Sequence, residues 1–242
     1  MPGAAQLMLI GSVIHLDPAP AAFDAMIKGW KPQQMSRMLS ASTIEPRLDL
    51  VRRFEKFVGT HPWKWNPSDV EDWTSSLLGG DKPRSHSTIG GYQNSLRLFL
   101  KYITDPRYGW LERCQELFDE IPQQICHKWN AAEHLSEFEA RPSVRPLTCD
   151  ELEAFFARCD EPVDEIRGRG RKGTLVALRD AQMFKTYYAW GLRRNEGVSL
   201  DLVDLRANPY KRDWGIFGSI QVRYGKAVKG SPPRRRTALS VP

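Results

Sequence analysis

The chain has 242 residues, of which 41% are hydrophobic and 26% are charged, and its formal net charge is +6. These proportions are typical of a soluble globular protein with one large or two small domains. No apolar run approaches the ~20 residues of a membrane-spanning helix, and the short run Leu7–Ile10 lacks the basic leading segment of a secretory signal.

The amino-terminal half is a series of short amphipathic helices. We assign residues 1–19 to an extension, after which prolines break up a short helical face. Stronger helices follow from Ser42, from Asn66, where a proline occupies the first turn, and from Ser85, and a further segment covers 110–120. We therefore predict a helical domain over residues 20–125.

The helix that begins at Ser85 is the clearest of this half, because six apolar residues from Ile89 to Ile103 fall at helical spacing. Its exposed side is predicted to carry polar amides and bases: Gln93, Asn94, Arg97 and Lys101. A helix lying along DNA presents such a face. Any solvated helix does so too, and the pattern alone does not separate the two.

The second half begins after a predicted linker over 126–145, where no period is sustained. Thr148 and Glu151 form a capping box, and the helix they start is predicted to bury an apolar face.

A glycine-basic loop over 167–173 is either a phosphate-contacting loop or a solvated insertion. The next helix, from Leu175 to Trp190, carries an aromatic stripe that we predict to be core. The faces concerned are Leu152, Phe155, Phe156 and Cys159 in the first helix, and Leu175, Leu178, Phe184, Tyr187, Tyr188 and Trp190 in the second.

A corner follows at Gly191, a residue type that ends helices in a left-handed cap. Arg193 and Arg194 come next, and a new apolar helix is predicted to run to Asp204. A scaffold-held arginine suits bidentate capture of a phosphate, so Arg193 is the candidate phosphate ligand. The alternative is a surface arginine that pairs with Glu196 across one helical turn.

The carboxyl-terminal segment is a predicted β-hairpin with a strong positive charge. Ile220, Val222 and Tyr224 alternate with polar residues, residues 225–233 turn, and a returning strand carries Thr237, Leu239 and Val241. From residue 214 onward there is no Asp or Glu, and the six basic residues equal the net charge of the whole chain. The segment is predicted either to face a polyanion or to be a solvated basic tail. These six residues are Arg223, Lys226, Lys229, Arg234, Arg235 and Arg236.

The four cysteines, at positions 114, 126, 149 and 159, include no C-x-x-C pair. We therefore expect buried free thiols in a cytoplasmic protein, with a metal site as the less favoured alternative. No cofactor is expected.

Four stretches together resemble the tyrosine recombinases, the phage-integrase family of DNA strand-exchange enzymes, over residues 20–242. Gly191-Leu-Arg-x-x-Glu196 resembles the family's first arginine box, and Gly225-Lys-x-x-Lys229 its lysine hairpin, with Ala227 in place of a glycine. The stretch from Ser85 to Tyr102 resembles the signature of the family's core-binding domain, a Ser-x-x-Thr-Ile opening before a helix with an aromatic-rich end. Arg145-Pro-Leu-Thr-x-x-Glu151 resembles the entry to the catalytic domain.

The resemblance implies a mainly α protein: a SAM-like helical core-binding bundle over 20–125, then an α+β catalytic domain with a β-hairpin over 146–242. It implies a double-stranded DNA partner, no membrane, and self-association of the full-length protein on DNA. Arg193 would be a catalytic phosphate ligand and Lys226 the general acid, with Lys229 as the alternative acid. DNA contacts are expected from Arg97, Lys101, Arg194, Lys229, Arg234, Arg235 and Arg236.

The family's chemistry also requires a His-x-x-Arg box, a further His or Trp, and a tyrosine nucleophile, all after the lysine hairpin. The last histidine here is His134, no histidine has arginine three residues on, and no tyrosine follows Tyr224. Without a nucleophile no covalent intermediate forms. We expect an incomplete site-specific recombinase that is inactive alone; the alternatives are a non-catalytic DNA-binding module and, more distantly, a basic helical RNA-binding protein.

Overall fold

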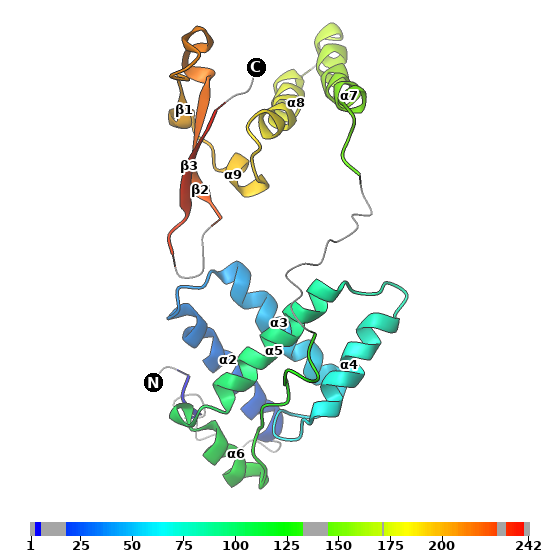
Figure 1. The fold of residues 1–242 in the computed structure, drawn as a ribbon, viewed down its shortest axis with the longest axis vertical. Coiled ribbons are helices and arrows are strands. Elements are labelled where there is room, and N and C mark those ends of the chain that lie inside the picture. The colour runs from blue at the N-terminus through cyan, green and yellow to red at the C-terminus, as the bar shows by residue number, and fades with distance from the viewer. Residues whose placement is uncertain (1–2, 6–17, 133–144, 171, 227–230, 240–242) are drawn as a thin grey trace. The chain divides into compact units, whose positions relative to one another are not determined.

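The computed structural model describes residues 3–5, 18–132, 145–170, 172–226 and 231–239 (Figure 1). The chain divides into two compact units between residues 138 and 139. Helices predominate in the described parts, and a three-stranded antiparallel sheet belongs to the second unit. The predicted mainly α class is therefore confirmed.

The first unit contains five α-helices within the described residues. Asn66 and Ser85 cap two of them as predicted, each by accepting a backbone N–H. Pro18 and Pro20 lie in the first turn of the first helix, where no N–H partner is needed. Pro32 lies inside this helix, which continues to Met35. The helices are α2 (Pro18–Met35), α3 (Ala41–Val58), α4 (Pro67–Gly79), α5 (His86–Ile103) and α6 (Trp110–Phe118).

An aromatic core holds these helices together. The ring of Trp30 meets Phe99 edge-on at 5.3 Å, and Phe54 meets Trp65 at 4.8 Å and Trp73 at 5.1 Å. Edge-to-face pairs of this kind add to the free energy of burial. All five of these side chains are buried.

The first core extends beyond the predicted boundaries of 20 and 125 at both ends. The Gly3 carbonyl accepts hydrogen bonds from Tyr102 Oη at 2.5 Å and Trp110 Nε1 at 3.1 Å. Cys126 is buried in the same core, and the backbone N–H of Ala132 donates to the Gln93 side chain at 2.7 Å. The described start of the predicted linker thus packs on the first unit.

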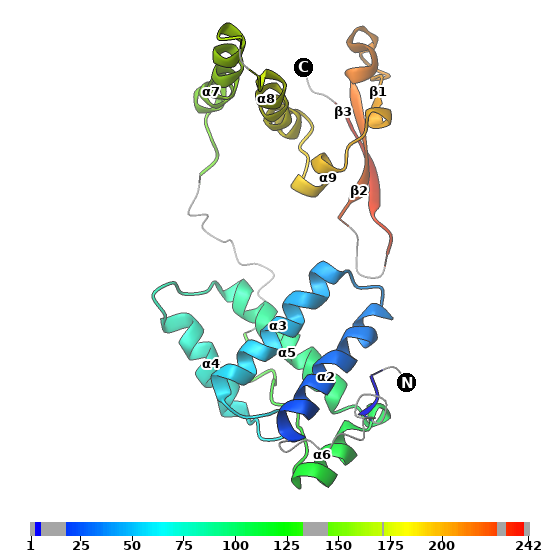
Figure 2. The same ribbon diagram turned by 180° about the vertical axis from the view of Figure 1, so that it is seen from behind.

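The second unit combines a helical hairpin with the small sheet (Figure 2). The strands lie in the order β1-β2-β3, and Ile220 pairs with Ala238 and Val222 with Arg236. The core beneath the sheet is small, with Leu192, Ile220 and Val222 buried. The elements are α7 (Cys149–Gly168), α8 (Thr174–Ala189), α9 (Arg194–Val198), η2 (Leu202–Asp204), β1 (Leu205–Arg206), η3 (Arg212–Phe217), β2 (Ser219–Gly225) and β3 (Arg234–Leu239).

The predicted burial of the two long helices is wrong for Phe155, Leu175, Phe184 and Tyr188, which are exposed, whereas the other residues of the predicted faces are half-buried. The two helices pack on each other, with Phe155 against Phe184 at 5.4 Å and Phe156 against Tyr188 at 5.5 Å. Yet the side of this pair away from the contact is exposed, and Leu175 retains 80% of its accessible surface. No further layer covers it among the residues that the structure describes. Helix α7 also runs to Gly168, which shortens the predicted glycine-basic loop.

The apolar helix predicted to end at Asp204 is also different. Helix α9 stops after five residues, and the Asp204 carboxylate accepts the Asp201 N–H at 2.9 Å, which opens the separate 3-10 turn η2. Val198 and Leu202 are exposed as a result.

The predicted hairpin is present, but its inner face is not the predicted one. Ala238 is the buried residue of β3, because it pairs with buried Ile220, and Thr237 and Leu239 face outward. A bulge between Val222 and Gly225 leaves Tyr224 exposed. Val241 lies outside the described residues.

Candidate phosphate-binding corner

The corner after α8 forms as the sequence predicts. Gly191 adopts a left-handed φ of 56°. The N–H of Leu192 donates to the Tyr187 carbonyl at 3.0 Å and that of Gly191 to the Tyr188 carbonyl at 3.3 Å. These two bonds define a Schellman motif, which favours glycine at the left-handed position. The motif ends α8 and places Arg193 at the N-cap of α9.

Arg193 is held by Glu196. The Glu196 carboxylate accepts the Arg193 backbone N–H at 2.9 Å and its guanidinium Nη1 at 2.9 Å. The ion pair between Arg193 and Glu196, expected in the alternative interpretation, is therefore present. However, the carboxylate is buried, whereas 65% of the Arg193 side chain is exposed. Most of the guanidinium fork is free to meet an anion.

A second arginine reaches the same carboxylate from the sheet. Arg236 Nη2 lies 2.9 Å from Glu196 Oε2 and donates to the Gly191 carbonyl at 3.2 Å. Burial raises the pKa of Glu196, but the Arg193 N–H and the guanidinium groups of Arg236 and Arg193 outweigh it and lower the pKa to about 2. Glu196 is thus ionised, and it joins α9 to β3.

The end of β2 runs against this carboxylate. A Cβ added at Gly225 would lie 3.5 Å from Glu196 Oε1 and 2.6 Å from the Arg234 carbonyl, so a larger residue would not fit without a shift. Lys226 follows and is exposed. We call Arg193, Glu196, Gly225 and Arg236 the Glu196 cluster. Lys229, the alternative acid, lies outside the described residues.

Sequence reasoning missed a second ionic network on the other side of β2. Arg223 Nε lies 2.6 Å from the buried Asp204 carboxylate, and its Nη2 also contacts Asp201. Its hydrogen bonds to Asp204 and Asp201 raise the pKa of Arg223. Burial raises the pKa of Asp204, but the hydrogen bonds from Arg223 and the Asp201 N–H, together with the charges of Arg223 and Arg206, outweigh it and leave that pKa lowered. The Asp-x-x-Asp spacing before the strand was the available signal. Arg223 is therefore already neutralised.

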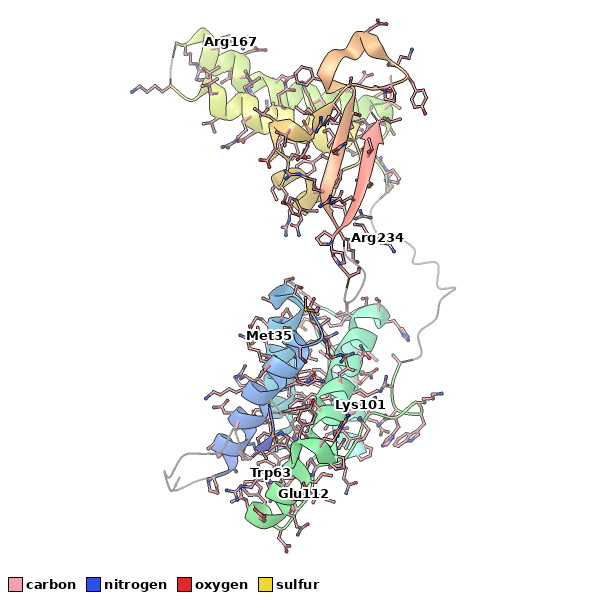
Figure 3. All side chains as sticks on the ribbon, turned by 90° about the vertical axis from the view of Figure 1, so that its left-hand side faces the viewer. Met35, Trp63, Lys101, Glu112, Arg167 and Arg234 are labelled. Carbon is pink, nitrogen blue, oxygen red and sulfur yellow. The ribbon has the colours of Figure 1, made fainter. Side chains whose placement is uncertain are left out.

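The basic face predicted for α5 is only partly present. Gln93 is buried rather than exposed, because its amide donates to Thr74 Oγ1 at 2.9 Å and accepts from Ala132. Arg97 is half-buried and its Nε donates to the Cys126 carbonyl at 3.3 Å. Lys101 is exposed (Figure 3). Of the predicted DNA contacts in the first unit, Lys101 is the more accessible.

The remaining predicted contacts lie in the second unit. Arg194, Arg234 and Arg235 are exposed, and their side chains form no ion pair or hydrogen bond with the residues that the structure describes. Arg236 differs from its two neighbours because it is bound to Glu196. Figure 3 shows Arg234 at the start of β3.

The described residues contain no group of three or more His, Cys, Asp or Glu side chains that could hold a metal ion. Cys114 and Cys126 are buried, and burial raises the pKa of each thiol to about 12. Cys149 is exposed and Cys159 half-exposed, so the expectation of buried thiols fails for these two. No helix in the described parts of the chain is long and apolar enough to cross a membrane.

In comparisons with known proteins, no family model matches this sequence, and no curated protein matches it significantly.

Proposed function

We propose that the chain is a DNA-binding protein of the tyrosine-recombinase type, in which Arg193 holds a backbone phosphate and Lys226 would be the general acid if an attacking group were supplied. The Glu196 cluster is the observation that carries the proposal. It draws together residues from α9, from the end of β2 and from β3, and Lys226 follows directly on it.

The arrangement suits the recognition of phosphate. Glu196 fixes Arg193 through both its backbone N–H and its guanidinium. A positioned guanidinium costs little reorganisation when charge develops on the non-bridging oxygens of a phosphodiester. The cluster has two guanidinium groups for one carboxylate, so a net positive charge remains for an anion.

Strand cleavage would need an attacking oxygen as well as these groups. Among the 242 residues no tyrosine follows Tyr224 and no His-x-x-Arg occurs. We therefore propose phosphate binding, and not cleavage, as the activity of this chain by itself. In the same proposal the first unit is a SAM-like core-binding bundle, and the protein self-associates on double-stranded DNA.

A non-catalytic DNA-binding module is the second candidate. One observation favours it: the free cations Arg234 and Arg235 lie in a stretch without acidic residues, which provides affinity for DNA without any chemistry.

Phosphate-ethylation interference tests the proposal. Duplexes bound by the full chain are selected from a random-sequence pool, and single phosphates in them are then ethylated. We expect that ethylation of one particular phosphate prevents binding of the wild type but not of Arg193→Ala. Arg194→Ala is the matched control, because Arg194 is the adjacent exposed arginine, and it should still sense that phosphate.

Two results would count against the proposal. If Arg193→Ala gives the same interference pattern as the wild type, Arg193 is not the ligand of that phosphate. A chain that does not bind duplex DNA at all would overturn the proposed function as a whole.

A further inference from the structure

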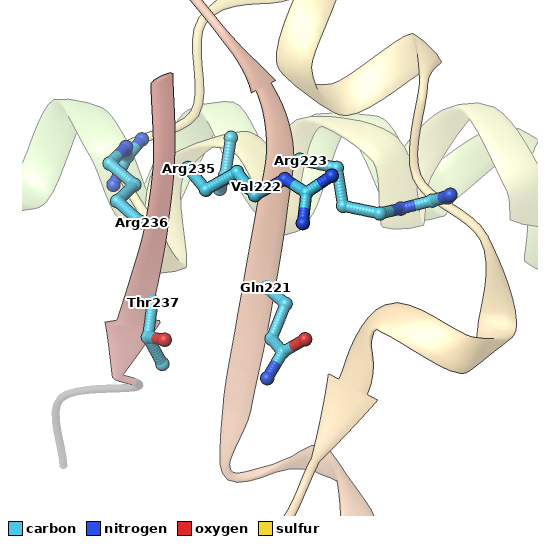
Figure 4. A pocket seen from close by; sticks show the side chains of 6 residues that line it. All are labelled: Gln221, Val222, Arg223, Arg235, Arg236 and Thr237. Carbon is cyan, nitrogen blue, oxygen red and sulfur yellow. The ribbon is translucent and has the colours of Figure 1, made fainter. Parts of the chain in front are cut away.

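The two faces of the β2–β3 hairpin differ in chemistry. Ile220, Val222 and Ala238 are buried against the helices, whereas the opposite side is polar and open. On that side lies a shallow depression of about 470 Å³. We call four of the residues that line it the outer ribbon face: Gln221, Arg223, Arg235 and Thr237 (Figure 4).

The outer ribbon face is a row of hydrogen-bonding side chains, and none of its four residues is acidic. Gln221 lies directly opposite Thr237 on the neighbouring strand. Arg235, two residues before Thr237, has a guanidinium without an ion pair or hydrogen bond to the described residues. Arg223 is bound to Asp201 and Asp204. Arg235 is therefore the free cation of the face, flanked by an amide and a hydroxyl.

The shape of the hairpin fits a duplex groove. A two-stranded antiparallel ribbon can enter the major groove of B-form DNA, which is about 12 Å wide. The bulge between Val222 and Gly225 increases the twist of the ribbon. The major groove of A-form RNA is too narrow for such a ribbon.

We infer that the outer ribbon face enters the major groove of double-stranded DNA, where Arg235 reads a guanine and Gln221 and Thr237 contact the neighbouring base edges. This inference rests on the proposed function and adds sequence recognition to it. A guanidinium fork matches the two acceptors that guanine presents in this groove, and an amide matches adenine. The Glu196 cluster would meanwhile hold the phosphate backbone.

The experiment compares base preference with overall affinity. Binding sites are selected from random-sequence duplexes with the full chain, and competition binding then measures the preference at each position for the wild type and its variants. Arg235→Lys keeps the charge but loses the fork. We expect it to lose about tenfold of the preference for guanine at one position, with less than about a threefold change in binding to non-specific duplex.

Two further variants make the result specific. Thr237→Val keeps the side-chain shape but removes the hydroxyl, and it should weaken the preference at an adjacent position. Arg234→Lys is the matched control, because Arg234 is the neighbouring free arginine outside the depression. It should leave every base preference unchanged.

Unchanged base preferences in Arg235→Lys would overturn the inference, and so would a wild type that binds all duplexes equally. Unchanged base preferences in Arg235→Lys leave the proposed function standing, because ethylation interference at Arg193 tests it separately. Absence of any duplex binding would overturn both.

Discussion

The carboxylate of Glu196 meets two arginines that come from different elements. Glu196→Gln keeps the size of the side chain but removes its charge. Because a buried partner is lost, we expect the opening free energy of the β2–β3 amides to fall by about 1–3 kcal/mol in native-state hydrogen exchange at pH 7. Glu153→Gln, a change of the same kind at an exposed position of α7, should have no effect.

The same residue gives the second unit a defined pH dependence. The pKa of Glu196 is lowered to about 2 from an ordinary value of 4.5. Its contribution is therefore complete above pH 4.5 and is lost as the pH falls towards 2. Between pH 7 and pH 3 the wild type should lose part of its β2–β3 protection. An equal loss in Glu196→Gln would mean that another group is responsible.

The residue pattern indicated the Arg193–Glu196 contact as the alternative to a phosphate ligand, because a spacing of three brings side chains together on a helix. It did not predict that Glu196 is buried. The partner that buries it, Arg236, lies 40 residues further along the chain. Such a contact depends on how the hairpin packs against α9, which local spacing does not contain.

At the scale of elements, the contact between α8 and α9 is the tightest near the corner. A Cβ added at Gly197 would lie 2.3 Å from the Tyr187 ring, and Tyr187 Oη donates to the Arg194 carbonyl at 2.9 Å. Gly197→Ala should therefore push α9 from α8 and cost about 1–3 kcal/mol. Hydrogen exchange in α9 and β2 measures this cost.

A control identifies the cause. Tyr187→Phe together with Gly197→Ala keeps the ring and hence the clash, whereas Tyr187→Ala with Gly197→Ala removes it. Each double variant is compared with the single variant that carries the same change at Tyr187. If Gly197→Ala costs the same free energy in both backgrounds, steric overlap with the ring is not the reason.

Helix positions and caps followed closely from the sequence. Asn66, Ser85 and Thr148 all cap the helices predicted to start there, because capping is a local interaction. Burial was less predictable. The aromatic stripe of α8 was expected to be core, yet Phe184 and Tyr188 are exposed. Periodicity shows which face is apolar, but only the tertiary arrangement decides what covers it.

At the scale of the whole molecule, the boundaries of the first unit can be tested directly. The fragment 1–132 retains the Gly3 carbonyl beneath Tyr102 and Trp110, as well as buried Cys126. The fragment 20–125 lacks these contacts. We expect both to melt cooperatively by circular dichroism, with 1–132 more stable by several degrees, since about 1 kcal/mol corresponds to roughly 4–8 °C for a domain of this size. Equal melting temperatures would contradict the structural boundaries.

The salt dependence of DNA binding separates free from neutralised cations. Lys226 and Arg234 are exposed, whereas Arg236 is bound to Glu196. Replacing Lys226 and Arg234 with Gln should reduce the slope of log affinity against log salt by about two, at roughly 0.9 per phosphate contact. Arg236→Gln should affect stability more than slope. A slope that the double replacement leaves unchanged would show that these two side chains do not touch phosphate.

The last prediction concerns covalent chemistry. Arg193 and Lys226 could stabilise charge and move a proton, but neither can replace an attacking oxygen. Given a nicked duplex that traps a phosphotyrosyl intermediate, the 242-residue chain should leave no protein–DNA adduct on a denaturing gel. An intact tyrosine recombinase with its own nicked substrate is the positive control. The exposed tyrosines Tyr188, Tyr210 and Tyr224 are the residues that could contradict this prediction. Each would be changed to Phe in turn, and an adduct lost in any one of these variants would identify a nucleophile that the family pattern does not contain.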